Sequence, residues 1–144
     1  MMQICFSREI DKKATRTAVE QRLESVRLYK RIGFVRREMK VTSLTELRFH
    51  GATNVVSKQA ENIAIWNVDT DDRMKEEQRQ VEQAVTGLSE VERQVIRMRY
   101  LEDEEMFDYN VYSELNLSER KYYRVKSSAL CKLAFALRLE KYAE

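Results

Sequence analysis

The stretch that decides the fold is VYSELNLSERKYYRVKSSALCKL, residues 111–133. It predicts a short helix, a tight turn around Asn116, and a longer second helix that begins at Ser118. This is the layout of a helix-turn-helix, in which the second helix enters the major groove of DNA and the first braces it across the backbone. The second helix carries five cationic side chains up to residue 132 against the single carboxylate of Glu119. The stretch therefore predicts a surface that binds phosphate.

Helical spacing divides the second helix into two faces. One face is apolar and is expected to be buried: Tyr122, Val125, Ala129, Leu130, Leu133 and Leu137. The residues predicted to contact DNA are Ser118, Glu119, Arg120, Lys121, Tyr123, Arg124, Lys126 and Ser127. Arg120 and Arg124 lie one turn apart and suit guanine, because arginine can donate two parallel hydrogen bonds to its O6 and N7. Lys121, Lys126 and the Ser118 hydroxyl suit phosphate, and Tyr123 suits a phosphate or a sugar.

Composition favours an all-α fold. The 144 residues include no proline, three glycines and 35% charged side chains. No apolar run approaches the roughly 20 residues of a membrane span, and the first six residues are too short an apolar segment for a signal peptide. We therefore expect no membrane partner and a cytoplasmic location.

Charge is segregated along the chain, although the net charge is only +2. Residues 11–40 hold ten Lys/Arg and four Asp/Glu, 58–117 hold seven and fifteen, and 118–141 hold seven and two. Two basic ends thus flank an acidic middle, and a polyanion responds to such local fields rather than to the sum. Taken alone, each charged cluster is equally compatible with a solvated helix face.

Five helices are expected, in three segments. Residues 1–57 hold a basic helix over 11–32, stopped by Gly33, and an irregular connector. Residues 58–87 form an acidic helix with an apolar stripe, interpreted as one long helix, although a break at 69–72 stays open. Residues 88–144 form the helix-turn-helix domain. The apolar stripe of the acidic helix consists of Ala60, Ile63, Ala64, Val68, Met74, Val81 and Val85.

Within 88–144, capping residues predict where helices begin. Ser89 and Glu92 have capping-box spacing. The helix that follows is expected to bury Val91, Val95, Ile96, Met98 or Arg99, Tyr100 and Leu101. After an acidic loop at 102–105, Asp108 is expected to cap a helix over 109–115. Asn116 can take the left-handed conformation that ends a helix. Ser118 is expected to cap the last helix, which continues to about residue 142.

Catalytic, metal and cofactor sites are not expected. The single histidine, His50, has no cysteine or carboxylate at ligand or triad spacing. Cys5 and Cys131 are far apart and form no CxxC motif, so they indicate neither a disulfide framework nor a zinc site. The three glycines are isolated and form no phosphate-binding loop. An enzyme is therefore not expected.

Two protein families resemble stretches of the chain. Residues 88–100 and 111–133 resemble region 4 of bacterial primary-type sigma factors, in which a similar helix precedes a helix-turn-helix. The family's groove-contacting positions fall on Glu119, Arg120, Lys121, Tyr123 and Arg124. The chain departs from the sigma pattern at Tyr112, where a small residue is usual, and at Asn116, where glycine is usual. Because the reading side chains differ as well, recognition of the promoter −35 element is not carried over, and no region that melts the −10 element is present.

The ArpU-type family of phage late-gene regulators, related in style to RinA-type activators, is similar over roughly residues 11–139. The similarity lies in length, in the basic helix that starts DKKATR at residue 11, in the acidic central helix, and in the motif YYRVK at 122–126 followed by Ala129-Leu130. This resemblance implies a phage or prophage activator that binds double-stranded DNA at a promoter and contacts bacterial RNA polymerase. The acidic segments 102–108 and 69–82 are possible surfaces for that contact, or simply solvated charge.

Other functions stay open. In a sigma-like subunit, residues 11–85 would bind the polymerase core. A helical phage assembly or packaging adaptor would bind nucleic acid without sequence preference, since a fold does not settle function. A homodimer would match a palindromic site, and the amphipathic stretches 11–32 and 58–85 would supply either its interface or a cover for the core of one chain.

Overall fold

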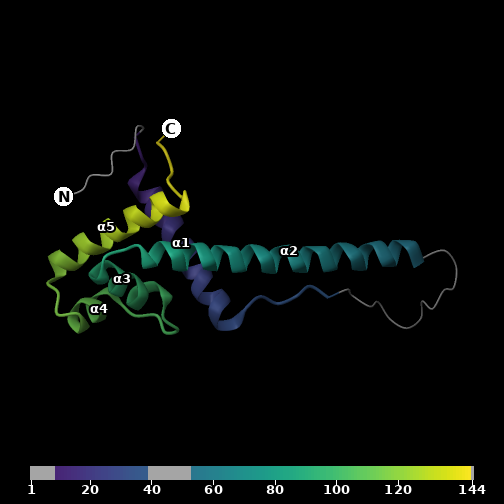
Figure 1. Ribbon diagram of the computed structural model, residues 1–144, viewed down its shortest axis with the longest axis horizontal. Coiled ribbons are helices and arrows are strands. Elements are labelled where there is room, and N and C mark those ends of the chain that lie inside the picture. The colour runs from purple at the N-terminus through teal and green to yellow at the C-terminus, as the bar shows by residue number, and fades with distance from the viewer. Residues whose placement is uncertain (1–8, 39–52, 144) are drawn as a thin grey trace.

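The computed structural model describes residues 9–38 and 53–143, and of residues 53–57 only the backbone. The fold is all-α, as predicted. Along the chain the elements are α1 (Lys12–Ile32), α2 (Thr53–Thr86), α3 (Glu90–Ile96), the π-helical turn η2 (Arg97–Leu101), α4 (Asp108–Glu114) and α5 (Glu119–Leu137). Figure 1 shows α1, α3, α4 and α5 gathered around one end of α2, whose other end reaches away from them.

α1 begins and ends at residues that suit helix termini. The Asp11 carboxylate accepts a hydrogen bond from the Ala14 backbone amide at 3.0 Å, which satisfies one of the free amides of the first turn. Gly33 ends the helix with φ of 68° and ψ of −158°, a conformation that residues with a Cβ rarely adopt. The predicted helix over 11–32 and its glycine stop are therefore confirmed.

α2 is one continuous helix of 34 residues, so no break occurs at 69–72. Its last turns pack into the core through Val81 and Val85, which are fully buried. The apolar stripe is not buried in the first half of the helix, where Ala60, Ala64 and Val68 are exposed. That half reaches beyond the other helices (Figure 1), so no described helix covers these three residues.

Residues 34–38 run along α2 beside Trp66 and Asn67. The Arg37 backbone amide donates to Asn67 Oδ1 at 2.9 Å, and Asn67 Nδ2 donates to the Arg37 carbonyl at 3.1 Å. The Arg37 guanidinium lies over the Trp66 ring, 3.7 Å from its centroid, and Phe34 meets the same ring edge-on. This portion of the connector is thereby attached to α2. Residues 39–52, including His50, lie outside the described residues, and residues 53–57, which were predicted as connector, form the start of α2.

α3 starts with the predicted capping box. Ser89 Oγ accepts from the Glu92 amide at 3.3 Å, and Glu92 Oε1 accepts from the Ser89 amide at 3.1 Å. η2 continues α3 with a wider turn and buries Tyr100 and Leu101. The expectation for Val91 is wrong: it is 38% exposed, because the buried side of α3 is formed by Glu92, Val95 and Ile96.

One hydrophobic core joins helices that are far apart in sequence. Its buried members come from α1, the end of α2, the connection from α2 to α3, α3 with η2, and α5: Val19, Leu23, Val26, Val81, Val85, Leu88, Ile96, Tyr100, Leu101, Ala129, Leu130, Leu133 and Ala134. A smaller cluster of Val95, Val111 and Tyr122 holds α4 between α3 and α5. The three predicted segments, 1–57, 58–87 and 88–144, therefore share one core.

α5 ends earlier than expected. It stops at Leu137, where Arg138 takes a left-handed conformation with φ of 56°. The following residues pair with the segment before α1: the Asp11 amide donates to the Lys141 carbonyl at 2.9 Å, and the Ala143 amide donates to the Glu9 carbonyl at 3.1 Å. Continuing α5 to residue 142 would remove these bonds, which attach both ends of the described chain to each other.

Candidate nucleic-acid interface

The exposed face of α5 presents a basic surface. Seven of the eight residues predicted to contact DNA are exposed: Ser118, Glu119, Arg120, Lys121, Tyr123, Arg124 and Ser127. The opposite face is buried through Tyr122, Ala129, Leu130 and Leu133 in the two core clusters. The predicted division of this helix into a buried and an exposed face is therefore confirmed, with Val125 and Leu137 only partly buried.

Lys126 is a correction to the predicted phosphate contacts. Its side chain is only 5% exposed, and its ammonium lies 3.0 Å from Asp108 Oδ1. The ammonium also lies near the rings of Tyr100, Tyr122 and Tyr123, at 5.6 to 6.0 Å from their centroids. Because it is buried and paired, Lys126 is not available to a nucleic acid. The sequence held a signal for this, since Lys126 lies four residues after Tyr122 and seven before Leu133, inside the apolar stripe.

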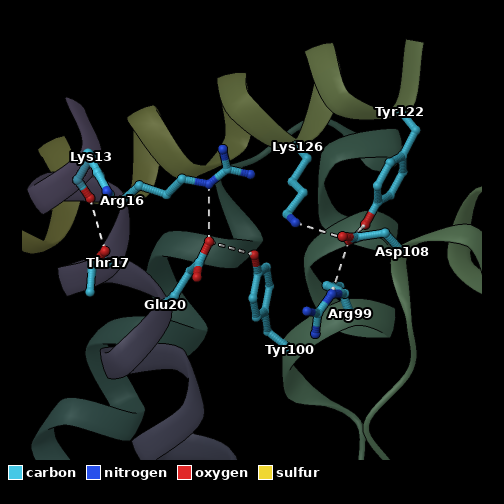
Figure 2. A network of polar contacts seen from close by, with 9 residues as sticks. All are labelled: Lys13, Arg16, Thr17, Glu20, Arg99, Tyr100, Asp108, Tyr122 and Lys126. Atoms are coloured by element: carbon cyan, nitrogen blue, oxygen red, sulfur yellow. Dashed lines mark hydrogen bonds and ion pairs between the residues drawn. The ribbon is translucent and has the colours of Figure 1, made fainter. Parts of the chain in front are cut away.

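Asp108 holds α4, α5 and η2 together, a role that the sequence did not predict. Figure 2 shows its carboxylate between three donors. Oδ1 accepts from the Tyr122 hydroxyl at 2.5 Å, from Lys126 Nζ at 3.0 Å and from Arg99 Nε at 3.0 Å. The expected cap of α4 by Asp108 is wrong, because Asp108 is the first residue of the helix and its carboxylate is directed to these donors; Phe107 is the capping residue and makes no side-chain bond.

The electrostatics of this cluster favour ionised Asp108. Burial raises the pKa of its carboxyl, but the hydrogen bonds from Tyr122 and Lys126 and the charges of Lys126 and Arg99 outweigh burial, so the pKa lies below its ordinary value. Burial and the bond to Asp108 raise the pKa of Tyr122 well above its ordinary value, so its hydroxyl keeps its proton and donates. α4 is thus fixed to α5 by charge as well as by packing.

Glu92 forms a second attachment, between α3 and α5. Besides its capping bond, its carboxylate accepts from Lys132 Nζ at 2.9 Å and from Ser128 Oγ at 3.1 Å. Burial raises the pKa of Glu92, but the bonds from Lys132, Ser89 and Ser128 lower it further than burial raises it. Glu92 and Asp108 therefore hold the buried side of α5 in one orientation and leave its basic face outward.

The turn between α4 and α5 is built by local chemistry. Asn116 takes φ of 55°, the left-handed conformation that the sequence predicted for it. The Leu117 amide donates back to the Tyr112 carbonyl at 2.9 Å. Ser118 then caps α5, its hydroxyl accepting from the Lys121 amide at 3.2 Å. The cap leaves the hydroxyl proton of Ser118 free to donate to another acceptor.

Tyr112, a departure from the sigma pattern, packs in the interior of this pair of helices. Its ring is half-buried, with its centroid 5.5 Å from that of Tyr122. Tyr122 in turn meets Tyr123 edge-on at 5.2 Å. The large ring is accommodated because it lies against Tyr122, the fully buried ring of the smaller core cluster.

Three other features bear on the kind of site: metal ligands, thiols and membrane-spanning helices. Within residues 9–38 and 53–143, no group of three or more His, Cys, Asp and Glu is placed to hold a metal ion. Cys131 is a free, exposed thiol on α5, and Cys5 lies outside the described residues. No described helix is both long enough and apolar enough to span a membrane.

Comparison with known proteins points to phages. A protein of Listeria innocua serovar 6a, described as "Uncharacterized phage-related protein Lin1259/Lin1739", is 28% identical over 140 residues, which cover 96% of this chain and 97% of that protein. No family model matches the chain. No solved structure matches it. The relative supports a phage origin, while the resemblances to ArpU-type regulators and to sigma region 4 stay predictions.

Proposed function

We propose that the chain is a phage regulator of transcription that binds double-stranded DNA in a sequence-specific manner. In this proposal α4, the turn at Asn116 and α5 form a helix-turn-helix, and α5 enters the major groove. The observation that carries the proposal is the fixed, outward basic face of α5. That face combines exposed Arg120, Lys121 and Arg124 with a buried side held by Asp108 and Glu92.

The exposed residues divide by chemistry into base-reading and backbone-binding groups. Arg120 and Arg124 lie one turn apart and read bases, because a guanidinium matches the acceptors of guanine. Lys121, the hydroxyl of Ser118 and the hydroxyl of Tyr123 bind phosphate and sugar, which fixes the position of the helix without reading sequence. Glu119 accepts from a base donor such as the cytosine amino group, and Ser127 lies further along the same face.

The proposal includes activation of transcription. The protein acts in the cytoplasm of a bacterial host and switches on late phage genes by contacting RNA polymerase at the promoter. The four carboxylates of 102–105 are all exposed next to α4 and suit a basic surface of the polymerase. A homodimer on a palindromic site is compatible with this mode of binding.

The test compares wild-type protein with the Arg120→Ala/Arg124→Ala variant. Wild-type protein first enriches a preferred sequence from a pool of randomised duplexes, and binding to that duplex and to a scrambled one is then measured across a salt series. We expect wild-type protein to prefer the enriched duplex, and the variant to lose about 1–3 kcal/mol of that preference for each base contact removed. Lys58→Ala/Arg73→Ala on α2 removes the same charge from exposed positions elsewhere and controls for it.

The outcome separates the classes of function. Equal binding of both duplexes by wild-type protein would refute sequence-specific regulation and favour the assembly or packaging adaptor, whose binding depends steeply on salt but not on sequence. Transcription with purified polymerase core distinguishes a sigma-like subunit. With such a subunit, transcription would start at the enriched site without a resident sigma factor.

A further inference from the structure

Two aromatic rings lie side by side on the surface where α4 begins. Phe107 is 64% exposed and Tyr109 is 57% exposed. Their rings are nearly parallel, with an interplanar angle of 6° and centroids 5.9 Å apart. Neither ring belongs to one of the two core clusters. The pair therefore forms a solvated aromatic surface that contributes little to the packing of the described helices.

The backbone that carries this aromatic pair is held in place on both sides. Met106 packs against the smaller core cluster, and the Asp108 carboxylate binds Lys126 of α5. Further upstream, Arg31 Nη1 donates to the carbonyl of Asp103 at 2.9 Å, which attaches the acidic loop to α1. A partner that binds the pair thus meets a preformed surface and loses little affinity to the cost of ordering it.

The charge around the aromatic pair is of one sign. Residues 102–117 hold six Asp/Glu and no Lys/Arg. Glu105 reaches Arg99 at 4.0 Å, whereas the exposed side chains of Glu102, Asp103 and Glu104 have no ion-pair partner within 9–38 and 53–143. This surface repels the phosphates of DNA and attracts a cationic partner.

We infer that Phe107 and Tyr109 anchor the contact with RNA polymerase by taking an arginine side chain from a basic surface of that enzyme. The inference rests on the proposed function and names the chemistry of the partner at the acidic loop 102–105. A guanidinium matches both parts of the surface, because it stacks flat on an aromatic ring and donates paired hydrogen bonds to a carboxylate. Aromatic residues and arginine are also the residues that dominate the affinity of protein interfaces.

The test measures binding to RNA polymerase purified from the bacterial host. The variant Phe107→Ala/Tyr109→Ala should bind at least about 30-fold more weakly than wild-type protein, the loss typical of anchor residues. Phe135→Ala/Tyr142→Ala is the matched control, since it removes the same two residue types from positions that are 49% and 46% exposed. The control should keep the wild-type affinity, and so should Phe107→Tyr/Tyr109→Phe, which keeps both rings.

Two further measurements separate the aromatic pair from its charged surroundings and from DNA. Glu102→Gln/Asp103→Asn/Glu104→Gln keeps the rings and should make association with polymerase slower and less dependent on salt. Phe107→Ala/Tyr109→Ala should bind the enriched duplex with wild-type affinity, because no cation lies on this surface. Circular dichroism melts check that each variant is folded.

The inference is overturned if Phe107→Ala/Tyr109→Ala binds polymerase as tightly as the matched control, or if wild-type protein does not bind polymerase. A loss of duplex binding by Phe107→Ala/Tyr109→Ala, with polymerase binding unchanged, would instead assign the rings to the DNA interface. The sequence preference of wild-type protein is measured without polymerase, so the DNA-binding proposal can fail while the polymerase contact stands, and the reverse.

Discussion

Removing the Asp108 carboxylate should destabilise the protein far more than removing its buried partner Lys126. In Asp108→Ala the Lys126 ammonium, whose side chain is 5% exposed, loses its ion-pair partner, and the Tyr122 hydroxyl loses its acceptor. Breaking a buried pair in this way costs about 3–5 kcal/mol. Since the Asp108 side chain is 26% exposed, water reaches the vacated site and we expect the lower end, about 3 kcal/mol.

The opposite change leaves a group that is still satisfied. In Lys126→Met, Asp108 keeps its bonds from Tyr122 and Arg99, and a side chain of similar length fills the buried space. The expected loss is about 1 kcal/mol, that of one hydrogen bond. In the double variant no unpaired ammonium remains, so its loss should be smaller than the sum of the two single losses by more than about 1 kcal/mol.

Urea unfolding followed by circular dichroism measures these differences. With slopes of about 1–3 kcal/mol per molar urea for a protein of this size, a loss of about 3 kcal/mol lowers the midpoint by about 1–3 M. Wild-type protein, the two single variants and the double variant form a double-mutant cycle, in which they serve as controls for one another, provided that the dependence of their unfolding free energy on urea has the same slope. Single losses that add to the double loss within about 0.5 kcal/mol would refute the buried pair. Equal losses for Asp108→Ala and Lys126→Met would refute the asymmetry that burial of Lys126 implies.

The same contacts lead to three further predictions. Because Lys126 is buried, Lys126→Met should leave the salt dependence of DNA binding at its wild-type value, and a reduced slope would return Lys126 to the interface. Asn116→Ala should lower the free energy of unfolding by about 1–2 kcal/mol and Asn116→Gly should not, since φ of 55° strains a residue with a Cβ; equal urea midpoints would contradict this. The pKa values of Asp108 and Glu92 lie below the ordinary 3.8 and 4.5, so their ionised forms stabilise the fold fully above those ordinary values. This stabilisation is lost as the pH falls through the lower pKa values of the folded protein. The variant Asp108→Asn/Glu92→Gln should therefore show a flatter dependence of the unfolding free energy on pH across that acid range.

Features that depend on neighbouring residues were predictable. The capping box of Ser89 and Glu92, the cap at Ser118, the left-handed Asn116 and the stop at Gly33 all occur where the sequence places them. Each depends on contacts within four residues or on the conformational preference of one residue, so the sequence contains the whole interaction.

Features that depend on distant partners were not predictable in the same way. The stripe of α2 continues past the point where other described helices cover it, so Val68 is exposed while Val81 is buried. Asp108 has the position of a helix cap in the sequence, and only the fold brings Tyr122 and Lys126, 14 and 18 residues away, beside it. α5 ends at Leu137 because the residues after it pair with the segment before α1, at the other end of the chain.

The sequence by itself determined an all-α chain, the turn between α4 and α5, and the basic character of the face that α5 turns outward. These follow from composition, capping and a period of about 3.6 residues, which are local properties. Only the tertiary structure decided which cations stay outside, because it buries Lys126 against Asp108. The physical reason is that a lysine within an apolar stripe can be buried only when a carboxylate meets it, and that carboxylate is supplied by the packing of another helix.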